Sequence, residues 1–174
     1  MRTIRYILVL LMMTITMGIQ AQQFHDQLLE NVKGNVKYIV YSRSGRSEVA
    51  NFSKDGKIQK DAIINPTYNK EGYMTKCQYL FYGTYCDMTY NYKNGKLVKE
   101  CVKTDSGTAV TEYIYNADGT IRDEVQTITK DGLSKSFTLT AQYMEFDDHG
   151  NWTRRIISCN KKTFADSRAI LYWE

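Results

Sequence analysis

Three glutamates, Glu100, Glu112 and Glu124, recur at intervals of 12 residues and are the strongest candidates for chemistry in the chain. If the turn types set out below fix the strand register, their carboxylates lie side by side on adjacent strands, about 5 Å apart, and repel one another. Such a row would raise at least one carboxyl pKa, bind a hard cation such as Ca²⁺, or supply the carboxylate pair of a retaining glycosidase. The alternatives are that the side chains spread into water or that this register is wrong.

The other residues that could react or bind metal have simpler explanations. His25 and His149 have no serine or cysteine nucleophile that the sequence pairs with them. The segment from Asp147 to Asn151 has oxygen ligands, but it lacks the alternating ligands and distal glutamate of a calcium loop. Aspartate and asparagine also form turns, and this explains the segment. We therefore predict no catalytic residue and no cofactor, and leave open a metal at the glutamate row.

Tyrosine is unusually frequent, with 14 residues in 174. Most of them are expected to be structural, because tyrosine is a favoured strand residue. Tyr82 and Tyr85 are expected to pair on the sheet face away from the core. An exposed Tyr82/Tyr85 patch is therefore the first candidate for binding a glycan or a protein.

The four cysteines, Cys77, Cys86, Cys101 and Cys159, allow three disulfide pairings or none. None has the Cys-x-x-Cys spacing of a zinc or redox site, and the simplest interpretation is that they are small apolar strand residues. The register places Cys77 and Cys159 in one row but six strands apart, about 29 Å in an open sheet. A disulfide between them would require the sheet to close.

The elements that must position these residues follow from the glycines. Ten glycines recur mostly every 11 to 13 residues, with strand-like sequence between them: Gly34, Gly45, Gly56, Gly72, Gly83, Gly95, Gly107, Gly119, Gly132 and Gly150. Turns at this spacing indicate a β-meander. We expect three-residue loops at the last four of these glycines, and two-residue loops at Gly83-Thr84 and Asn94-Gly95.

An aromatic residue commonly stands four positions before the glycine and an apolar residue two positions after it. A three-residue loop that ends in a left-handed glycine makes these two residues direct cross-strand partners. The pattern predicts the pairs Phe52/Ile58, Tyr68/Met74, Tyr115/Ile121 and Phe146/Trp152. The shorter Asn94-Gly95 loop gives the equivalent pair, Tyr92/Leu97.

The motifs Tyr-x-x-Asp-Gly-x-Ile at 115–121 and Phe-Asp-Asp-His-Gly-Asn-Trp at 146–152 resemble the YD repeats of Rhs-type surface proteins. The chain is similar to small secreted domain-of-unknown-function proteins with such hairpins, over most of residues 41–154. The resemblance implies a β-hairpin array at the cell exterior, without inherited catalytic residues.

The predicted fold is all-β: an antiparallel meander of about 10 to 12 strands over residues 35–174, forming a curled sheet or open barrel. Apolar residues Phe24, Leu28, Leu29 and Val32 have helical spacing and predict a short helix over residues 22–33, which would cover a sheet edge or plug one end. Residues 22–174 form one domain, since no linker divides them.

Residues 1–21 have the basic, apolar and small-residue order of a secretory signal peptide. We therefore expect a periplasmic or extracellular protein with no membrane span after signal cleavage. The whole chain has 23 Lys+Arg and 19 Asp+Glu. Without Arg2 and Arg5 the balance is 21 minus 19, or +2, which gives no electrostatic reason to bind nucleic acid.

Three functions fit the sequence. The first is a non-enzymatic interaction or adhesion module that binds a glycan or protein through its sheet surface. The second is a periplasmic carrier that encloses an apolar ligand within the curled sheet. The third is a glycan-active enzyme that uses the glutamate row, and only this one predicts loss of activity when the glutamates become glutamine.

Overall fold

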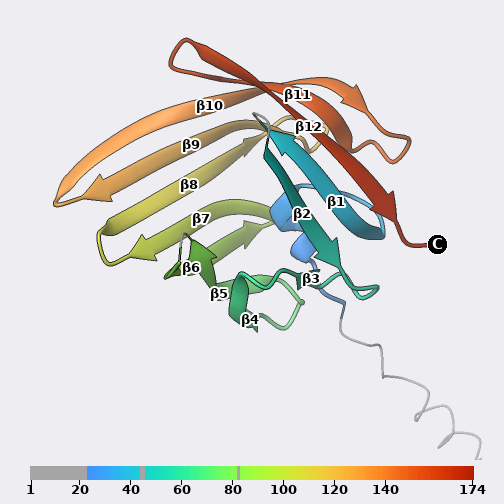
Figure 1. Cartoon of the computed structure of the whole chain (residues 1–174), viewed down its shortest axis with the longest axis horizontal. Coiled ribbons are helices and arrows are strands. Elements are labelled where there is room, and N and C mark those ends of the chain that lie inside the picture. The colour runs from blue at the N-terminus through green and yellow to red at the C-terminus, as the bar shows by residue number, and fades with distance from the viewer. Residues whose placement is uncertain (1–22, 44–45, 82) are drawn as a thin grey trace, which may run out of the picture.

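The computed structural model of the protein describes residues 23–43, 46–81 and 83–174, so the expected signal peptide lies outside the described residues. A single twelve-stranded antiparallel sheet makes up the fold, with the order β3-β2-β1-β12-β11-β10-β9-β8-β7-β6-β5-β4 (Figure 1). This confirms the predicted meander. The strands are β1 (Val36–Arg43), β2 (Arg46–Phe52), β3 (Ile58–Gln59), β4 (Ile63–Tyr68), β5 (Met74–Phe81), β6 (Thr84–Lys93), β7 (Lys96–Thr104), β8 (Gly107–Tyr115), β9 (Ile121–Lys130), β10 (Leu133–Phe146), β11 (Trp152–Cys159) and β12 (Lys162–Tyr172).

The hairpins that carry the aromatic and glycine motif all turn at the same end of the sheet, which we call the motif end. The predicted pairs are confirmed in all five: Phe52↔Ile58, Tyr68↔Met74, Tyr92↔Leu97, Tyr115↔Ile121 and Phe146↔Trp152. Each pair contributes on the order of 0.2–1 kcal/mol, so the repeated motif chiefly fixes the register next to each turn.

Beyond these pairs, four of the five hairpins contain a β-bulge that the sequence analysis did not predict. The third residue after the glycine has no partner on the facing strand: Thr75, Val98, Arg122 and Thr153. A bulge bends the strand and increases its twist. It also reverses the faces on which the following residues lie, relative to a regular ladder.

At the opposite end, which we call the open end, the predicted loops are wrong. The β5–β6 ladder closes at Phe81↔Thr84, so Thr84 belongs to β6 and not to the predicted Gly83-Thr84 loop. Two-residue loops also replace the expected three-residue loops at Gly107 and Gly132, because the ladders close at Thr104↔Gly107 and Leu133↔Lys130. Asp131 and Gly132 both have positive φ, as a type I′ turn requires.

The sheet curls into a nearly closed barrel because its N-terminal and C-terminal strands pair. β1 runs antiparallel to β12, with Ile39 opposite Ile170 and Tyr41 opposite Arg168. The two ends of the sheet are then β3 and β4, which follow each other in sequence. No ladder joins these two strands in the described part of the chain, so a seam is left between them.

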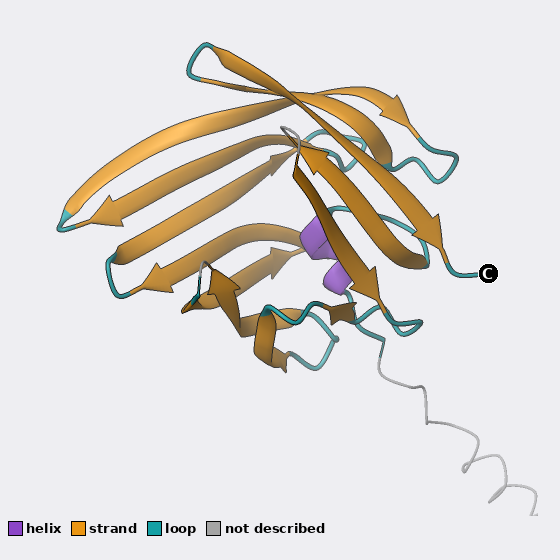
Figure 2. Cartoon of the chain, in the orientation of Figure 1, coloured by secondary structure: helices purple, strands orange, loops and turns teal. Residues whose placement is uncertain are grey.

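The N-terminal segment 23–33, which we call the plug, lies inside the curve of the sheet (Figure 2). It contains one 3-10 helix, η1 (Asp26–Glu30), and not the longer amphipathic helix that the spacing predicts. Asn31 ends the helix in a left-handed conformation. The guanidinium of Arg168 donates to the carbonyl of Glu30 at 2.8 Å and to that of Asn31 at 3.3 Å, so β12 satisfies carbonyls at the end of the helix.

The plug enters between two turns of the motif end. Phe24 N–H donates to the Asp55 carbonyl at 2.7 Å, and His25 N–H donates to the Gly72 carbonyl at 3.1 Å. A Cβ atom on Gly72 would lie 2.1 Å from the Gln23 carbonyl oxygen, and φ there is +86°. Only glycine therefore allows the plug backbone to pass so close to this turn.

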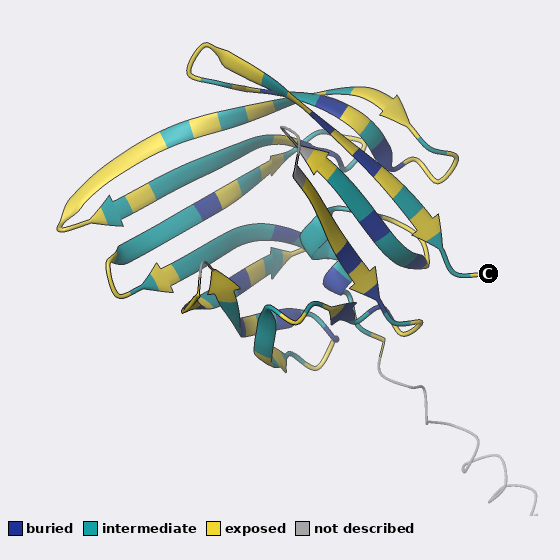
Figure 3. Ribbon diagram, viewed as in Figure 1, coloured by how far each residue is buried: buried dark blue, intermediate teal, exposed yellow. Residues whose placement is uncertain are grey.

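The core lies at the motif end, around the plug, and the hairpin tips of the open end are exposed (Figure 3). Its buried residues come from the plug and strands on both sides of the seam: Val32, Val36, Ile39, Ala50, Phe52, Ile58, Met74, Cys77, Tyr90 and Leu97. All four cysteines are free thiols, with Cys77 and Cys86 buried. No helix in the described residues is long and apolar enough to cross a membrane.

Candidate functional site: a two-lobed interior cavity

The concave side of the sheet is only partly filled, and the unfilled space forms two adjoining lobes. One has a volume of about 580 Å³ and the other about 370 Å³. Both are bordered by Leu29 and Glu30 of the plug and by Lys60 at the end of β3. The plug therefore forms their common floor.

The larger lobe, which we call the apolar lobe, lies against β4 to β9. Its wall is mostly hydrocarbon and aromatic, with Ile63, Phe81, Met88, Val102, Ala109 and Ile128 among its residues. Phe81 and Ile128, which both border it, are 58% and 46% exposed. These exposed apolar side chains show that the lobe reaches the surface toward the open end.

The smaller lobe, which we call the polar lobe, is lined by an ion-pair network. The Arg155 guanidinium lies 3.2 Å from Asp166 and 3.9 Å from Glu124. It also stacks over the Trp152 ring, 4.3 Å from the centroid, and Arg168 lies 3.8 Å from the same ring. Both guanidinium groups stack on the Trp152 ring, and Arg155 also holds the carboxylates of Asp166 and Glu124. These contacts make the wall rigid, and two positive and two negative charges leave it nearly neutral.

The shared floor holds a second ion pair. Glu30 accepts hydrogen bonds from Lys60 Nζ at 3.1 Å and from the Tyr41 hydroxyl at 2.7 Å. Burial lowers the pKa of Lys60, but the Glu30 carboxylate outweighs this effect and leaves the pKa above its usual value. Lys60 thus stays charged and is neutralised by Glu30.

Of the two carboxylates that border the apolar lobe, Glu30 and Glu100, only Glu100 lacks a cation partner among the described residues. Its only hydrogen bond in the described structure is a long one from the Tyr113 hydroxyl, 3.5 Å. Burial raises the pKa of Glu100 to about 6, and repulsion by Glu124 adds to the effect, while Tyr113 opposes it. The carboxyl group is therefore mostly ionised at pH 7.5 and mostly protonated at pH 5.

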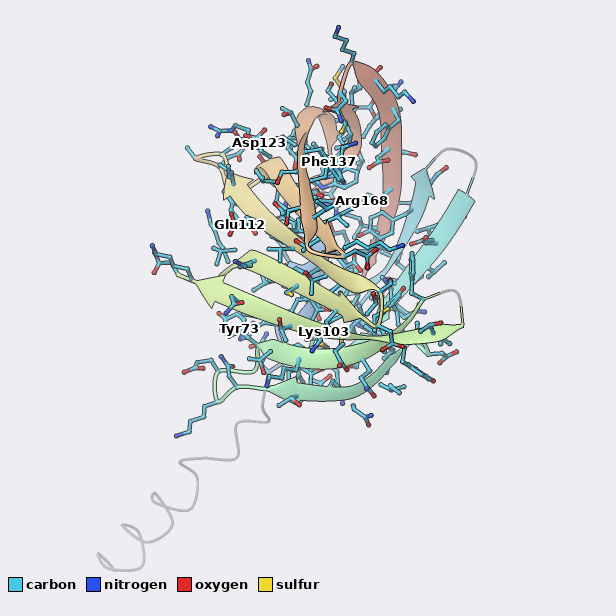
Figure 4. The ribbon with its side chains drawn as sticks, turned by 90° about the vertical axis from the view of Figure 1, so that its left-hand side faces the viewer. Tyr73, Lys103, Glu112, Asp123, Phe137 and Arg168 are labelled. Carbon is cyan, nitrogen blue, oxygen red and sulfur yellow. The ribbon has the colours of Figure 1, made fainter. Side chains whose placement is uncertain are left out.

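The predicted row of three glutamates does not form, which corrects the sequence-based register. Lys99 pairs with Glu112 and Glu100 with Thr111, because the β7–β8 loop is one residue shorter than predicted. Glu112 points outward, with 59% of its side chain exposed, and lies 3.2 Å from Lys99. Glu112 and Asp123 lie at the periphery of the molecule in Figure 4, whereas Arg168 lies toward its middle.

The bulges at Val98 and Arg122 bring the other two glutamates inside. They place Glu100 beside Tyr90 and Glu124 beside Tyr113, and both carboxylates border the cavity. β8 separates the two strands, so their backbones are about 9.6 Å apart. The predicted site is thus two interior glutamates and one exterior glutamate.

Tyr85 and Asp147, two further candidates, do not border either lobe. Tyr85 is 51% exposed on the convex face, as expected, but its partner is Leu80 and not Tyr82, which is outside the described residues. Asp147 accepts the backbone N–H groups of His149 and Asn151 at 3.0 and 2.8 Å, the turn role assigned to it from the sequence. Within residues 23–43, 46–81 and 83–174, no group of three His, Cys, Asp or Glu side chains is placed to hold a metal ion.

Arg155 and Asp166, which line the polar lobe, and Arg168, which stacks on the Trp152 ring, were not predicted from the sequence. A signal was available in β12, where Asp166, Arg168, Ile170 and Tyr172 alternate along the strand and so share one face. Opposite charges on an otherwise apolar face indicate an inward ion-pair network. Comparison of the chain with protein-family models, curated proteins and solved structures finds no match.

Proposed function

We propose that the protein is a non-enzymatic, exported carrier that holds a small, mainly apolar ligand inside its curled sheet. The observation that supports this function best is the apolar lobe. Its volume of about 580 Å³ lies within the range of roughly 300 to 1,000 Å³ that is usual for small-molecule sites. It has a hydrocarbon wall, a few polar groups and access from the open end, which are the features of such sites.

The energetics favour the same function. Burial of apolar ligand surface contributes about 25 cal/mol per Å², and the β-ladders and the plug already hold the walls of the lobe in place. A ligand bound only to the folded state would also stabilise the protein by mass action.

The test is a fluorescence titration of the protein with N-phenyl-1-naphthylamine, a neutral apolar probe that becomes bright in apolar surroundings. The variant Ala109→Phe places a phenyl ring in the apolar lobe and is expected to weaken probe binding at least tenfold. The matched control is Ala169→Phe, at an exposed position of β12, where binding should not change. Equal binding by both variants, each with a cooperative thermal transition, would refute an interior site.

The interaction-module hypothesis keeps one specific observation in its favour. Leu80 and Tyr85 are cross-strand partners on the convex face, and both are exposed. A glycan and protein array distinguishes the two functions: a surface module loses its binding in Tyr85→Ala and keeps it in Ala109→Phe. The carrier gives the opposite result with the apolar probe.

A further inference from the structure

Two carboxylates, Glu30 and Glu100, border the apolar lobe, and Glu100 differs from Glu30 because no cation of the described residues pairs with it. Glu30 pairs with Lys60, while Glu124 and Asp166 share Arg155. Tyr113 gives Glu100 only one long hydrogen bond. The apolar lobe therefore contains one carboxylate whose charge the protein leaves unbalanced.

Within the part of the chain that the structure describes, no cation acts on Glu100. The ionisable groups that act on it from neighbouring elements are acidic or phenolic: Glu30 of η1, Cys77 of β5, Tyr90 and Tyr92 of β6, Tyr113 of β8 and Glu124 of β9. Lys60 borders the same lobe, but Glu30 holds it at 3.1 Å. With Glu30 and Lys60 neutralising each other, ionised Glu100 leaves the lobe with a net charge of about −1.

An apolar wall with one unbalanced carboxylate is complementary to a molecule that combines hydrocarbon with one positive charge. A ligand carboxylate would be repelled by Glu100, and a neutral alcohol would leave the charge uncompensated. Tyr79 and Tyr90 also border the lobe, and tyrosine rings attract cations through their faces.

We propose that the ligand is an amphiphile with a single ammonium group, which pairs with Glu100 while its hydrocarbon part lies along the apolar lobe. This inference rests on the proposed carrier function and adds the chemical class of the ligand. It requires an ion pair at the polar side of the lobe and burial of methylene groups along Val102, Ala109 and Ile128.

The experiment is displacement of N-phenyl-1-naphthylamine by three ten-carbon ligands below their micelle concentrations: decylamine, decanol and decanoate. At pH 7.5 we expect decylamine to bind at least tenfold more tightly than decanol, and decanoate to bind most weakly. Lengthening the amine by one methylene should strengthen binding by about fourfold while the chain still fits. At pH 5 the amine preference should shrink, because Glu100 becomes protonated whereas the amine stays charged.

Two variants locate the effect. Glu100→Gln should remove the preference for decylamine over decanol, while retaining decanol binding. Glu112→Gln is the matched control, because it removes an exposed carboxylate from the neighbouring strand and should leave the preference unchanged.

The two proposals fail in different ways. If decanol and the probe bind but decylamine has no advantage, or if Glu100→Gln keeps the advantage, the ammonium inference is wrong and the carrier stands. If neither the probe nor any of the three ligands binds, the carrier function itself is wrong.

Discussion

Replacing Asp26 with alanine should open the seam between β3 and β4. The Asp26 side chain is completely buried, and its Oδ2 atom accepts two hydrogen bonds from opposite sides of the seam. The Ile58 N–H of β3 donates at 2.9 Å, and the Tyr68 hydroxyl of β4 donates at 2.8 Å. Because no ladder in the described residues joins these strands, one carboxylate of the plug connects the two ends of the sheet.

The expected loss follows from these two bonds. Alanine leaves a backbone N–H and a hydroxyl without a partner, and each unsatisfied group costs about 1–3 kcal/mol when buried. The sum, roughly 2–6 kcal/mol, is reduced because alanine also removes a buried carboxylate that has a desolvation cost of its own. We therefore expect Asp26→Ala to lower the free energy of unfolding by about 2–4 kcal/mol, and Asp26→Asn, which keeps an acceptor oxygen, to lower it by about 1 kcal/mol.

The stability difference between the wild type and Asp26→Asn should depend on pH with a defined sign. Burial raises the pKa of Asp26, although Ile58 and Tyr68 act in the opposite direction. A raised folded-state pKa means that the folded protein binds the proton more tightly than the unfolded chain does. The wild type should therefore gain stability relative to Asp26→Asn as the pH falls through the folded-state pKa, and lose that gain as the pH rises.

Urea unfolding of the wild type and both variants measures these differences, and hydrogen exchange at the Ile58 amide reports the seam directly. Glu71→Ala, which removes an exposed acid from the adjacent β4–β5 turn, is the control and should change stability by less than about 0.5 kcal/mol. If Asp26→Ala is as stable as the wild type and its Ile58 amide is equally protected from exchange, this role of Asp26 is refuted.

Three further predictions follow from single contacts. Gly72→Ala should lower the free energy of unfolding in urea by at least about 2 kcal/mol more than Gly132→Ala does, because both glycines have positive φ but only a Cβ at Gly72 meets the Gln23 carbonyl. Equal losses of stability in the two variants would exclude the close contact between the plug and this turn. Tyr143→Phe should cost about 1 kcal/mol in thermal unfolding, because its hydroxyl donates to a β9 carbonyl at 2.6 Å, and an unchanged transition would contradict that bond. Glu100→Gln should raise the free energy of unfolding at pH 7.5 by up to about 2 kcal/mol, since the rise of the Glu100 pKa from 4.5 to about 6 penalises the ionised carboxylate. This advantage over the wild type should vanish as the pH falls to 4.5. A stability difference that does not change with pH would disprove the raised pKa.

The sequence by itself determined the turns of the motif end and the pairs beside them. Tyr92 opposite Leu97 and Tyr115 opposite Ile121 could be predicted because a hairpin loop is local: its length and the left-handed glycine fix which residues face each other. Glycine spacing likewise determined the meander and its approximate number of strands. The predicted loops failed at the open end, where Asp131-Gly132 forms a two-residue turn that a rule taken from the other end does not describe.

The tertiary structure alone decided which glutamates enter the cavity. A bulge at Val98 turns Glu100 inward and a bulge at Arg122 turns Glu124 inward, whereas Glu112 stays on the outer face. Such bulges accompany the strong twist of a sheet that curls until β1 meets β12, and that pairing joins residues more than 120 positions apart. Side-chain direction alternates with period two, so one unpaired residue reverses every position after it. The local pattern therefore fixed the turns of the motif end and the pairs beside them, and the closure of the whole sheet fixed which side chains it encloses.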